Sequence, residues 1–262
     1  LETVSRELTQ LRRKQKKHAL ARSERRRQRA RGGARTVGLA GYTNAGKSSL
    51  FLALSGKQVL VADKLFSTLE TTVGRMEMSP RVLLADTIGF IDELPSDLLD
   101  AFHATLDESL QCDLLLLVVD SSDEPDEFRR KLSTTRREVL ERGDESGMNI
   151  KVVLTKSDLG GNIESAIEIV NSMGMTEPLV VSSHDGQGMD ELRESIMYSL
   201  YGPKTTLVVS KGDDDERSAE AYVSQIYDLG IVTEKNDLEL TLWCGKAEMM
   251  KLISKSNGRI SI

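Results

Sequence analysis

The chain has 262 residues, enough for one sizeable hydrophobic core and a smaller second unit. Its longest apolar run, LLLLVV at 114–119, is far shorter than the ~20 residues of a membrane span, and no apolar leader opens it, so we expect a cytoplasmic protein without a membrane partner. The formal net charge of −6 is unevenly distributed, because residues 1–35 carry 13 Lys and Arg against 3 Asp and Glu, whereas the remainder carries 22 against 38.

The first predicted element is a basic helical arm at 1–34. Val4, Leu8 and Leu11 share one helical face, and no proline or glycine interrupts the arm before residue 32. Its charge should attract RNA phosphates, without base stacking, since no aromatic residue interleaves. A solvated or disordered tail is the alternative. The side chains expected to contact phosphates are Arg12, Arg13, Lys14, Lys16, Lys17, Arg25, Arg26 and Arg27.

Residues 35–203 alternate apolar strands with helical patterns, as at 126–143 and 162–174. This alternation indicates a three-layer α/β/α domain with a mostly parallel sheet covered on both faces. The strands are predicted at TVGLAG (36–41), RVLLAD (81–86), DLLLLVVD (113–120), IKVVLT (150–155) and PLVVS (178–182).

The first of these strands leads into GYTNAGKS at 41–48, which fits the phosphate-binding loop pattern G-x-x-x-x-G-K-[ST] of P-loop NTPases. Lys47 would face the β and γ phosphates of a nucleotide, and the Ser48 hydroxyl would ligate Mg²⁺. The residues assigned to nucleotide binding here are Gly41, Tyr42, Thr43, Asn44, Ala45, Gly46, Lys47, Ser48 and Ser49.

The strand RVLLAD ends in Asp86, and Gly89 follows three residues later. This DxxG spacing is typical of a carboxylate that acts on magnesium through a bound water and of a backbone amide that senses the γ phosphate.

Two later strand ends carry the pattern of a guanine site. Asp158 in TKSD can accept hydrogen bonds from both guanine N1–H and the 2-amino group, a donor pair that adenine lacks, and the stem of Lys156 can cover the base. The backbone near Ser183 could donate to guanine O6. The residues assigned to the base are Thr155, Lys156, Asp158, Leu159, Ser182, Ser183 and His184.

Residues 204–262 are predicted to form a small α+β domain that contains no interpretable motif. Leu238, Leu240 and Leu242 alternate along one strand and should face its core, which leaves Trp243 on the opposite face. Partial exposure and a covering helix are both open for this ring.

The motif stretches resemble those of the HflX family of GTPases. The similar stretches are GYTNAGKSSLFLAL, LFSTLETT at 65–72, DTIGFIDELPSDLLDAFHATLDES at 86–109 and DLLLLVVDSSDEP at 113–125. The resemblance implies a GTPase that binds the large ribosomal subunit and ribosomal RNA and separates stalled or idle ribosomes. It also implies that the arm is the remnant of a helical hairpin, with most of the family's N-terminal domain missing.

Carried over by position, the resemblance makes Thr72 the switch threonine that ligates magnesium, with Thr71, where the family usually has proline, as the fallback. Phe90 stands where many small GTPases have a water-orienting glutamine, so intrinsic hydrolysis should be slow. Asn44 resembles the potassium-coordinating asparagine of cation-activated GTPases, although a role as a simple loop cap is equally open. Thr155 replaces the family's usual asparagine, and its hydroxyl is expected to bond within the loop.

Together these features predict a magnesium-dependent, monomeric GTPase, in which Lys47, Thr72, Gly89 and Asn44 serve hydrolysis and K⁺ is a possible activator. Two alternatives stay open. One is an Obg-like GTPase of ribosome assembly, and the other is an RNA-binding module in which GTP is a static structural ligand.

Overall fold

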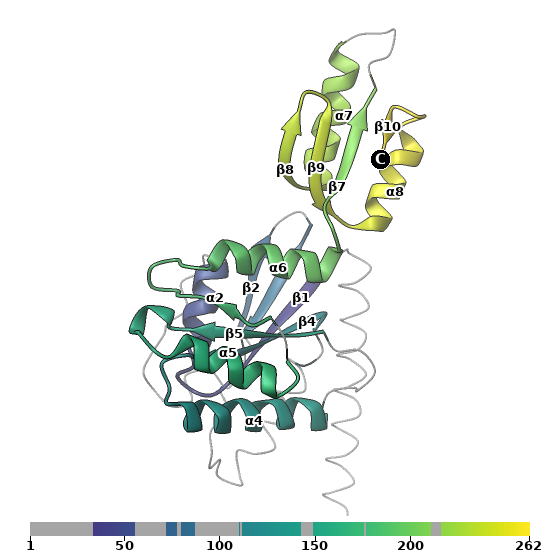
Figure 1. Cartoon of the computed structure of the whole chain (residues 1–262). Coiled ribbons are helices and arrows are strands. Elements are labelled where there is room, and N and C mark those ends of the chain that lie inside the picture. Colours follow the sequence, from purple (N-terminus) through teal and green to yellow (C-terminus); the bar gives the residue numbers. More distant parts are fainter. Residues whose placement is uncertain are drawn as a thin grey trace, which may run out of the picture.

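A computed structural model describes residues 34–55, 72–77, 80–86, 110, 112–142, 149–175, 177–210 and 216–262. The arm at 1–33, Thr71, and the segment with Gly89 and Phe90 lie outside these described residues, so the expectations for them stay predictions. The described residues form two sheets, joined by the short connection at 202–204 between α6 and β7 (Figure 1).

The first sheet has six strands in the order β2-β3-β1-β4-β5-β6. All neighbouring pairs are parallel except β2 and β3, so the prediction of a mostly parallel sheet is confirmed. The antiparallel edge strand β2 was not expected from the sequence, and β6 is shorter than the predicted PLVVS strand. The strands are β1 (Arg35–Ala40), β2 (Thr72–Glu77), β3 (Val82–Asp86), β4 (Leu114–Asp120), β5 (Ile150–Thr155) and β6 (Leu179–Val180).

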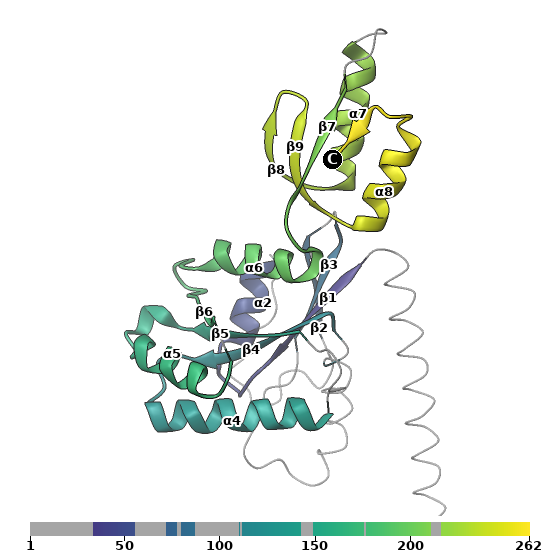
Figure 2. The ribbon, with the colours of Figure 1, turned by 45° about the vertical axis from the view of Figure 1, so that its right-hand side comes forward.

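Helices cover both faces of this sheet (Figure 2). Leu50 of α2 and Ile196 of α6 pack with Leu116 on one face, whereas Phe128 of α4 and Val170 of α5 pack with Leu117 on the other. All residues of β4 are buried, which explains its uninterrupted apolar sequence. The helices are α2 (Lys47–Ser55), α4 (Pro125–Arg142), the 3₁₀ helix η1 (Ser157–Leu159), α5 (Ile163–Ser172) and α6 (Met189–Tyr201).

The second sheet is antiparallel, with the strand order β10-β7-β9-β8. Its chain order of strand, helix, strand, strand, helix, strand is that of a ferredoxin-like unit. Leu207, Leu240 and Leu242 pack against Ile226 and Met249 of the two helices, so one sheet face holds a small core. The elements are β7 (Thr205–Val209), α7 (Glu216–Leu229), β8 (Gly230–Asn236), β9 (Glu239–Cys244), α8 (Lys246–Lys255) and β10 (Ile260–Ser261).

Trp243 lies on the opposite face of β9 from that small core, as its position in the strand predicted. Its side chain is buried and belongs to the apolar cluster of the large sheet, next to Leu200 and Tyr201 of α6. Of the two possibilities left open by the sequence, the structure therefore has the covered ring. Among the described residues, no helix is both long and apolar enough to cross a membrane.

Candidate functional site

The phosphate-binding loop leaves the carboxyl end of β1 and enters α2 at Lys47. Gly41 lies so close to β4 that a Cβ there would be 2.2 Å from the Val118 carbonyl oxygen, which only glycine avoids. Asn44 is exposed and Gly46 half-buried, and both have positive φ, at 66° and 85°. The loop thus bends over the N-terminus of α2, where backbone N–H groups and the helix dipole favour an anion.

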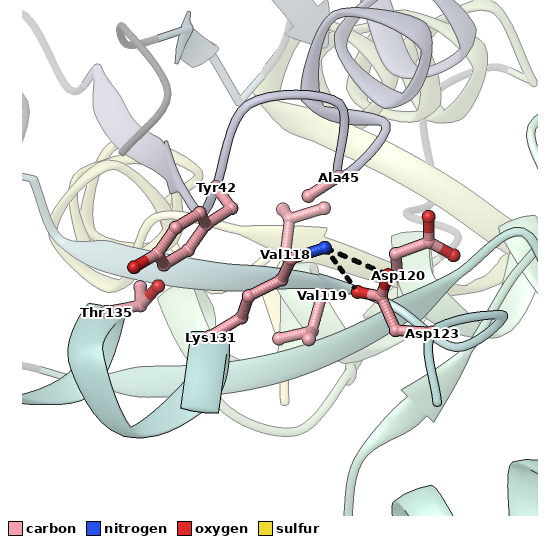
Figure 3. Close-up of a pocket in the computed structure, with 8 residues that line it drawn as sticks. All are labelled: Tyr42, Ala45, Val118, Val119, Asp120, Asp123, Lys131 and Thr135. Carbon is pink, nitrogen blue, oxygen red and sulfur yellow. Dashed lines mark hydrogen bonds and ion pairs between the residues drawn. The ribbon is translucent and has the colours of Figure 1, made fainter. Parts of the chain in front are cut away.

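The phosphate-binding loop packs against helix α4, and Figure 3 shows Tyr42 of the loop beside Thr135 of the helix. The buried Tyr42 ring lies 5.4 Å from the Arg130 guanidinium, a cation–π contact. Lys131 on the same helix donates to both carboxylate oxygens of Asp123, at 2.9 and 2.8 Å. Tyr42 is therefore a packing residue of the loop as well as part of its predicted binding sequence.

Lys47 is 6% exposed, and its ammonium donates a 2.7 Å hydrogen bond to the Tyr42 carbonyl. Burial lowers the pKa of this ammonium to about 8, although the negative charge of Asp86 acts in the opposite direction. The lysine is thus held under the loop with a charge that is easily lost in the free protein. A polyanion bound at the loop would restore the charged form.

Ser48 and Asp86 come together although 38 residues separate them in the chain. The Ser48 hydroxyl donates to Asp86 Oδ2 at 2.9 Å, where β3 ends beside the start of α2. A hydroxyl and a carboxylate beside a phosphate loop are hard oxygen donors of the kind that Mg²⁺ prefers. In the strand register Thr72 of β2 is the partner of Asp86, which brings its backbone to the same end of the sheet.

Thr155 links three elements at the end of β5. Its buried hydroxyl lies 2.7 Å from the Ala45 carbonyl and 3.1 Å from that of Val119, and its single hydrogen can be shared between them. The threonine therefore ties the phosphate loop to β4 and β5, whereas its hydroxyl was expected to bond within its own loop. Lys156 follows with φ 60° and ψ 35°, a left-handed backbone conformation that is uncommon outside glycine.

The Asp158 carboxylate is oriented by the loop after β6. Ser182 donates to Asp158 Oδ1 at 2.7 Å, and the Ser182 oxygen itself accepts from the backbone N–H of His184 and Asp185, at 3.1 and 3.3 Å. His184 is largely exposed, with Nδ1 3.9 Å from Asp158 Oδ2. Ser183 lies in the same turn, and Leu159 is 63% exposed beside Asp158. A fixed carboxylate in this position can accept a pair of N–H donors.

One residue of this region was missed by the sequence reasoning. Asp120, which ends β4 and is 8% exposed, accepts a 2.6 Å hydrogen bond from the Lys156 ammonium. Burial alone would raise the pKa of Asp120, but hydrogen bonds from Lys156 and Ser122 outweigh burial and lower it. The available signal was an acidic residue directly after a fully apolar strand that neighbours the phosphate loop.

Comparison with known proteins relates this site to ribosome-associated GTPases. The family model for 50S ribosome-binding GTPases matches residues 36–156, from β1 to Lys156. The GTPase HflX of Gluconacetobacter diazotrophicus is 42% identical over 163 residues, which cover 62% of this chain and 35% of that protein. The GTPase HflX of Methanocaldococcus jannaschii is 38% identical over 171 residues, which cover 63% of this chain and 41% of that protein. Over the matched residues the chain is similar to GTPases of the HflX family.

The fold agrees with a solved structure of a GTP-binding protein from Sulfolobus solfataricus in complex with GDP. The two chains are 28% identical with a TM-score of 0.53, over 63% of this chain and 52% of that one. This chain spans well under half the length of the HflX relatives above. The activity of those whole proteins is therefore a proposal for this chain.

Proposed function

We propose that this chain, as a member of the HflX family, binds GTP and GDP, hydrolyses GTP with the help of magnesium, and acts in the cytoplasm on the large ribosomal subunit. Nucleotide binding is supported by one observation above all. Residues suited to the phosphates and a carboxylate suited to the base lie at the carboxyl edge of the same mostly parallel sheet. Lys47 and Ser48 follow β1 at the phosphate loop, and Asp158, held by Ser182, follows β5, which lies two strands away in the same sheet.

The base-recognition step rests on Asp158. With Ser182 fixing its Oδ1, the carboxylate keeps acceptor lone pairs for guanine N1–H and the 2-amino group. Adenine presents no such donor pair, and a site built for these donors leaves its polar groups unpaired when adenine binds. We therefore expect strong selectivity for guanine over adenine nucleotides.

The donor set at the phosphate end fits magnesium. Ser48 and Asp86 would hold the ion, Asp86 through a water molecule, with Thr72 as a further ligand from β2. The ion supplies neutralisation of charge between the β and γ phosphates when it is bound. Lys47 supplies a second positive charge, and its low pKa in the free protein should rise when phosphates approach.

We further propose slow intrinsic hydrolysis. Phe90, directly after Gly89, can neither donate nor accept a hydrogen bond and so cannot orient the attacking water. Stimulation would come from the ribosome or from a monovalent cation at Asn44, whose exposed position on the loop is compatible with such a contact. The cation part is wrong if K⁺ and Na⁺ give equal rates with and without ribosomes.

The ribosomal part is supported by the similarity of the chain to HflX GTPases and by the charge of its first 35 residues, which should bind RNA phosphates with little sequence preference. Nucleotide-dependent contacts of the segments around Thr72 and Gly89 would then control how the chain sits on ribosomal RNA.

Two measurements test this function. Calorimetry should give GTP and GDP binding at least about a hundredfold tighter than ATP. Multiple-turnover phosphate release should rise when large ribosomal subunits are added. Equal affinity for ATP would overturn the guanine assignment, whereas tight GTP binding with a rate that ribosomes do not raise would favour GTP as a static ligand.

A further inference from the structure

We propose that Asp120 is a positioning residue of the guanine site, which acts by anchoring Lys156. The inference rests on the proposed guanine-nucleotide function and adds a residue outside the phosphate-loop, DxxG and TKSD motifs. In this assignment the Asp120 carboxylate binds the lysine ammonium at the end of β4. The aliphatic stem of Lys156 is then positioned to pack against the purine ring.

The ion pair is short, sheltered and directional. Lys156 Nζ lies 2.6 Å from Asp120 Oδ2, and the side chains are 29% and 11% exposed. The other carboxylate oxygen, Oδ1, accepts from both the backbone N–H and the hydroxyl of Ser122, at 2.9 and 2.6 Å. These two bonds fix the carboxylate plane, so Oδ2 is aimed at the lysine. Such a pair differs from exposed surface ion pairs, which contribute little.

The segment around Asp120 also supports the backbone of the base loop. Ser121 donates to the Thr155 carbonyl twice, from its N–H at 3.0 Å and from its hydroxyl at 2.7 Å. Gly161, which follows Lys156 in the chain, lies so close to Ser121 that a Cβ there would be only 2.1 Å from the Ser121 carbonyl oxygen. Residues 120–122 therefore contact the loop before, at and after Lys156.

This support matters because Lys156 itself has a costly conformation. A left-handed backbone at a non-glycine residue persists only where its surroundings impose it. A long lysine side chain also loses much rotamer freedom when it is held in one place. An anchored ammonium removes that entropy cost before the nucleotide arrives, and this pre-organisation should appear as tighter binding of the base.

The test uses Asp120→Asn, which keeps the shape and can still accept from Ser122 but loses the charge facing Lys156. Asp123→Asn is the matched control, because Asp123 lies three residues further on and pairs with Lys131 instead. For Asp120→Asn we expect GDP and GTP affinities to fall by the same factor, on the order of tenfold, the loss for one charge-assisted hydrogen bond. KM should rise with kcat unchanged, and the melting temperature should match that of Asp123→Asn.

A double-mutant cycle with Lys156→Met separates positioning from general damage. The two single variants should weaken binding to a similar extent, and the double variant should be no weaker than either. Additive losses, or a GDP affinity of Asp120→Asn equal to that of Asp123→Asn, would overturn the inference while leaving the proposed function intact. If the wild-type chain binds no guanine nucleotide, the proposed function fails and this inference fails with it.

Discussion

The two sheets of this chain use their surfaces in opposite ways. The six-stranded sheet is covered by helices on both faces, so only its strand ends are left to carry chemistry, and all of its candidate residues lie there. The four-stranded sheet has its own two helices on one face. On the other face α6 covers Trp243, and Thr206 and Thr241 share a hydrogen bond at 2.9 Å near the surface. Trp243, the aromatic residue of this sheet's described strands, packs into the apolar cluster of the large sheet.

This difference predicts which changes separate the two regions. Changes at strand ends of the large sheet should alter nucleotide binding and leave the small sheet folded. Changes at Trp243 should alter stability and leave nucleotide affinity as it is.

The largest effect is expected for Trp243→Ala. The ring is 6% exposed within an apolar cluster that includes Leu200, Tyr201 and Ile231, and its loss should lower the free energy of unfolding by about 3–5 kcal/mol. Denaturant unfolding followed by circular dichroism measures this change. The control is Thr241→Ala on the same strand face, which should cost far less. A clear fall in GDP affinity for Trp243→Ala would mean that the small sheet takes part in the nucleotide site.

Asp158→Asn tests the large sheet. In this variant the asparagine NH₂ group replaces one carboxylate oxygen and faces the N–H donors of guanine. GTP binding should therefore weaken by ~2–4 kcal/mol. Xanthosine triphosphate has a carbonyl in place of the 2-amino group and should lose much less, or gain. Isothermal titration with both nucleotides measures this contrast. Unchanged GTP affinity would remove the base-reading role of Asp158, and a lower melting temperature would show that the change is not confined to the site.

The same contrast explains what could be predicted from the sequence. Buried parallel strands appear as unbroken apolar runs, so β1, β3, β4 and β5 were predicted correctly, and Lys47, Asp86 and Asp158 lie at or just after the strand ends where they were expected. The edge strand β2 has the sequence TVGRME without clear alternation. It was missed because its packing depends on contact with α2, where a Cβ at Gly74 would lie 2.5 Å from Phe51 Cζ.

The part of the site that could not be predicted depends on contacts between distant segments. Asp120 is separated by 36 residues from Lys156, and nothing in the spacing of the two shows that they pair. The alternation of β9 predicted the correct strand face for Trp243. The ring is buried by α6, however, a helix that packs on the six-stranded sheet. Pattern and spacing give the face of an element, whereas its neighbour is set by tertiary packing.

A smaller effect on the nucleotide side is expected from pH. Burial lowers the pKa of Lys47 to about 8, so the free protein loses most of this charge between pH 7 and 8.5, and GTP affinity should fall roughly fourfold. Stability should change in the opposite direction. An unfolded chain, with a lysine pKa near 10.5, binds more protons than the folded one between about pH 8 and 10.5, so the contribution of Lys47 to the free energy of unfolding rises there.

Titration calorimetry in two buffers of different ionisation enthalpy measures the proton taken up with GTP above pH 8. GMP is the control, because it lacks the β and γ phosphates that should face Lys47 and should bind without this uptake. An equal proton uptake for GMP and GTP would assign the titration to another group.

The smallest effect concerns the connection between the sheets. Lys204 donates to Glu194 at 2.7 Å and also lies 5.6 Å from the centre of the Trp243 ring. Glu194→Gln removes only the ion pair and should cost a few tenths of a kcal/mol, because that glutamate is 65% exposed. Lys204→Met removes the cation–π contact as well, so it should cost ~0.5–1 kcal/mol more. Urea unfolding in low and high salt distinguishes the ion pair from the cation–π contact. High salt should abolish the loss of unfolding free energy in Glu194→Gln and leave most of the loss in Lys204→Met. Equal losses for the two variants would mean that Trp243 is held by apolar packing alone.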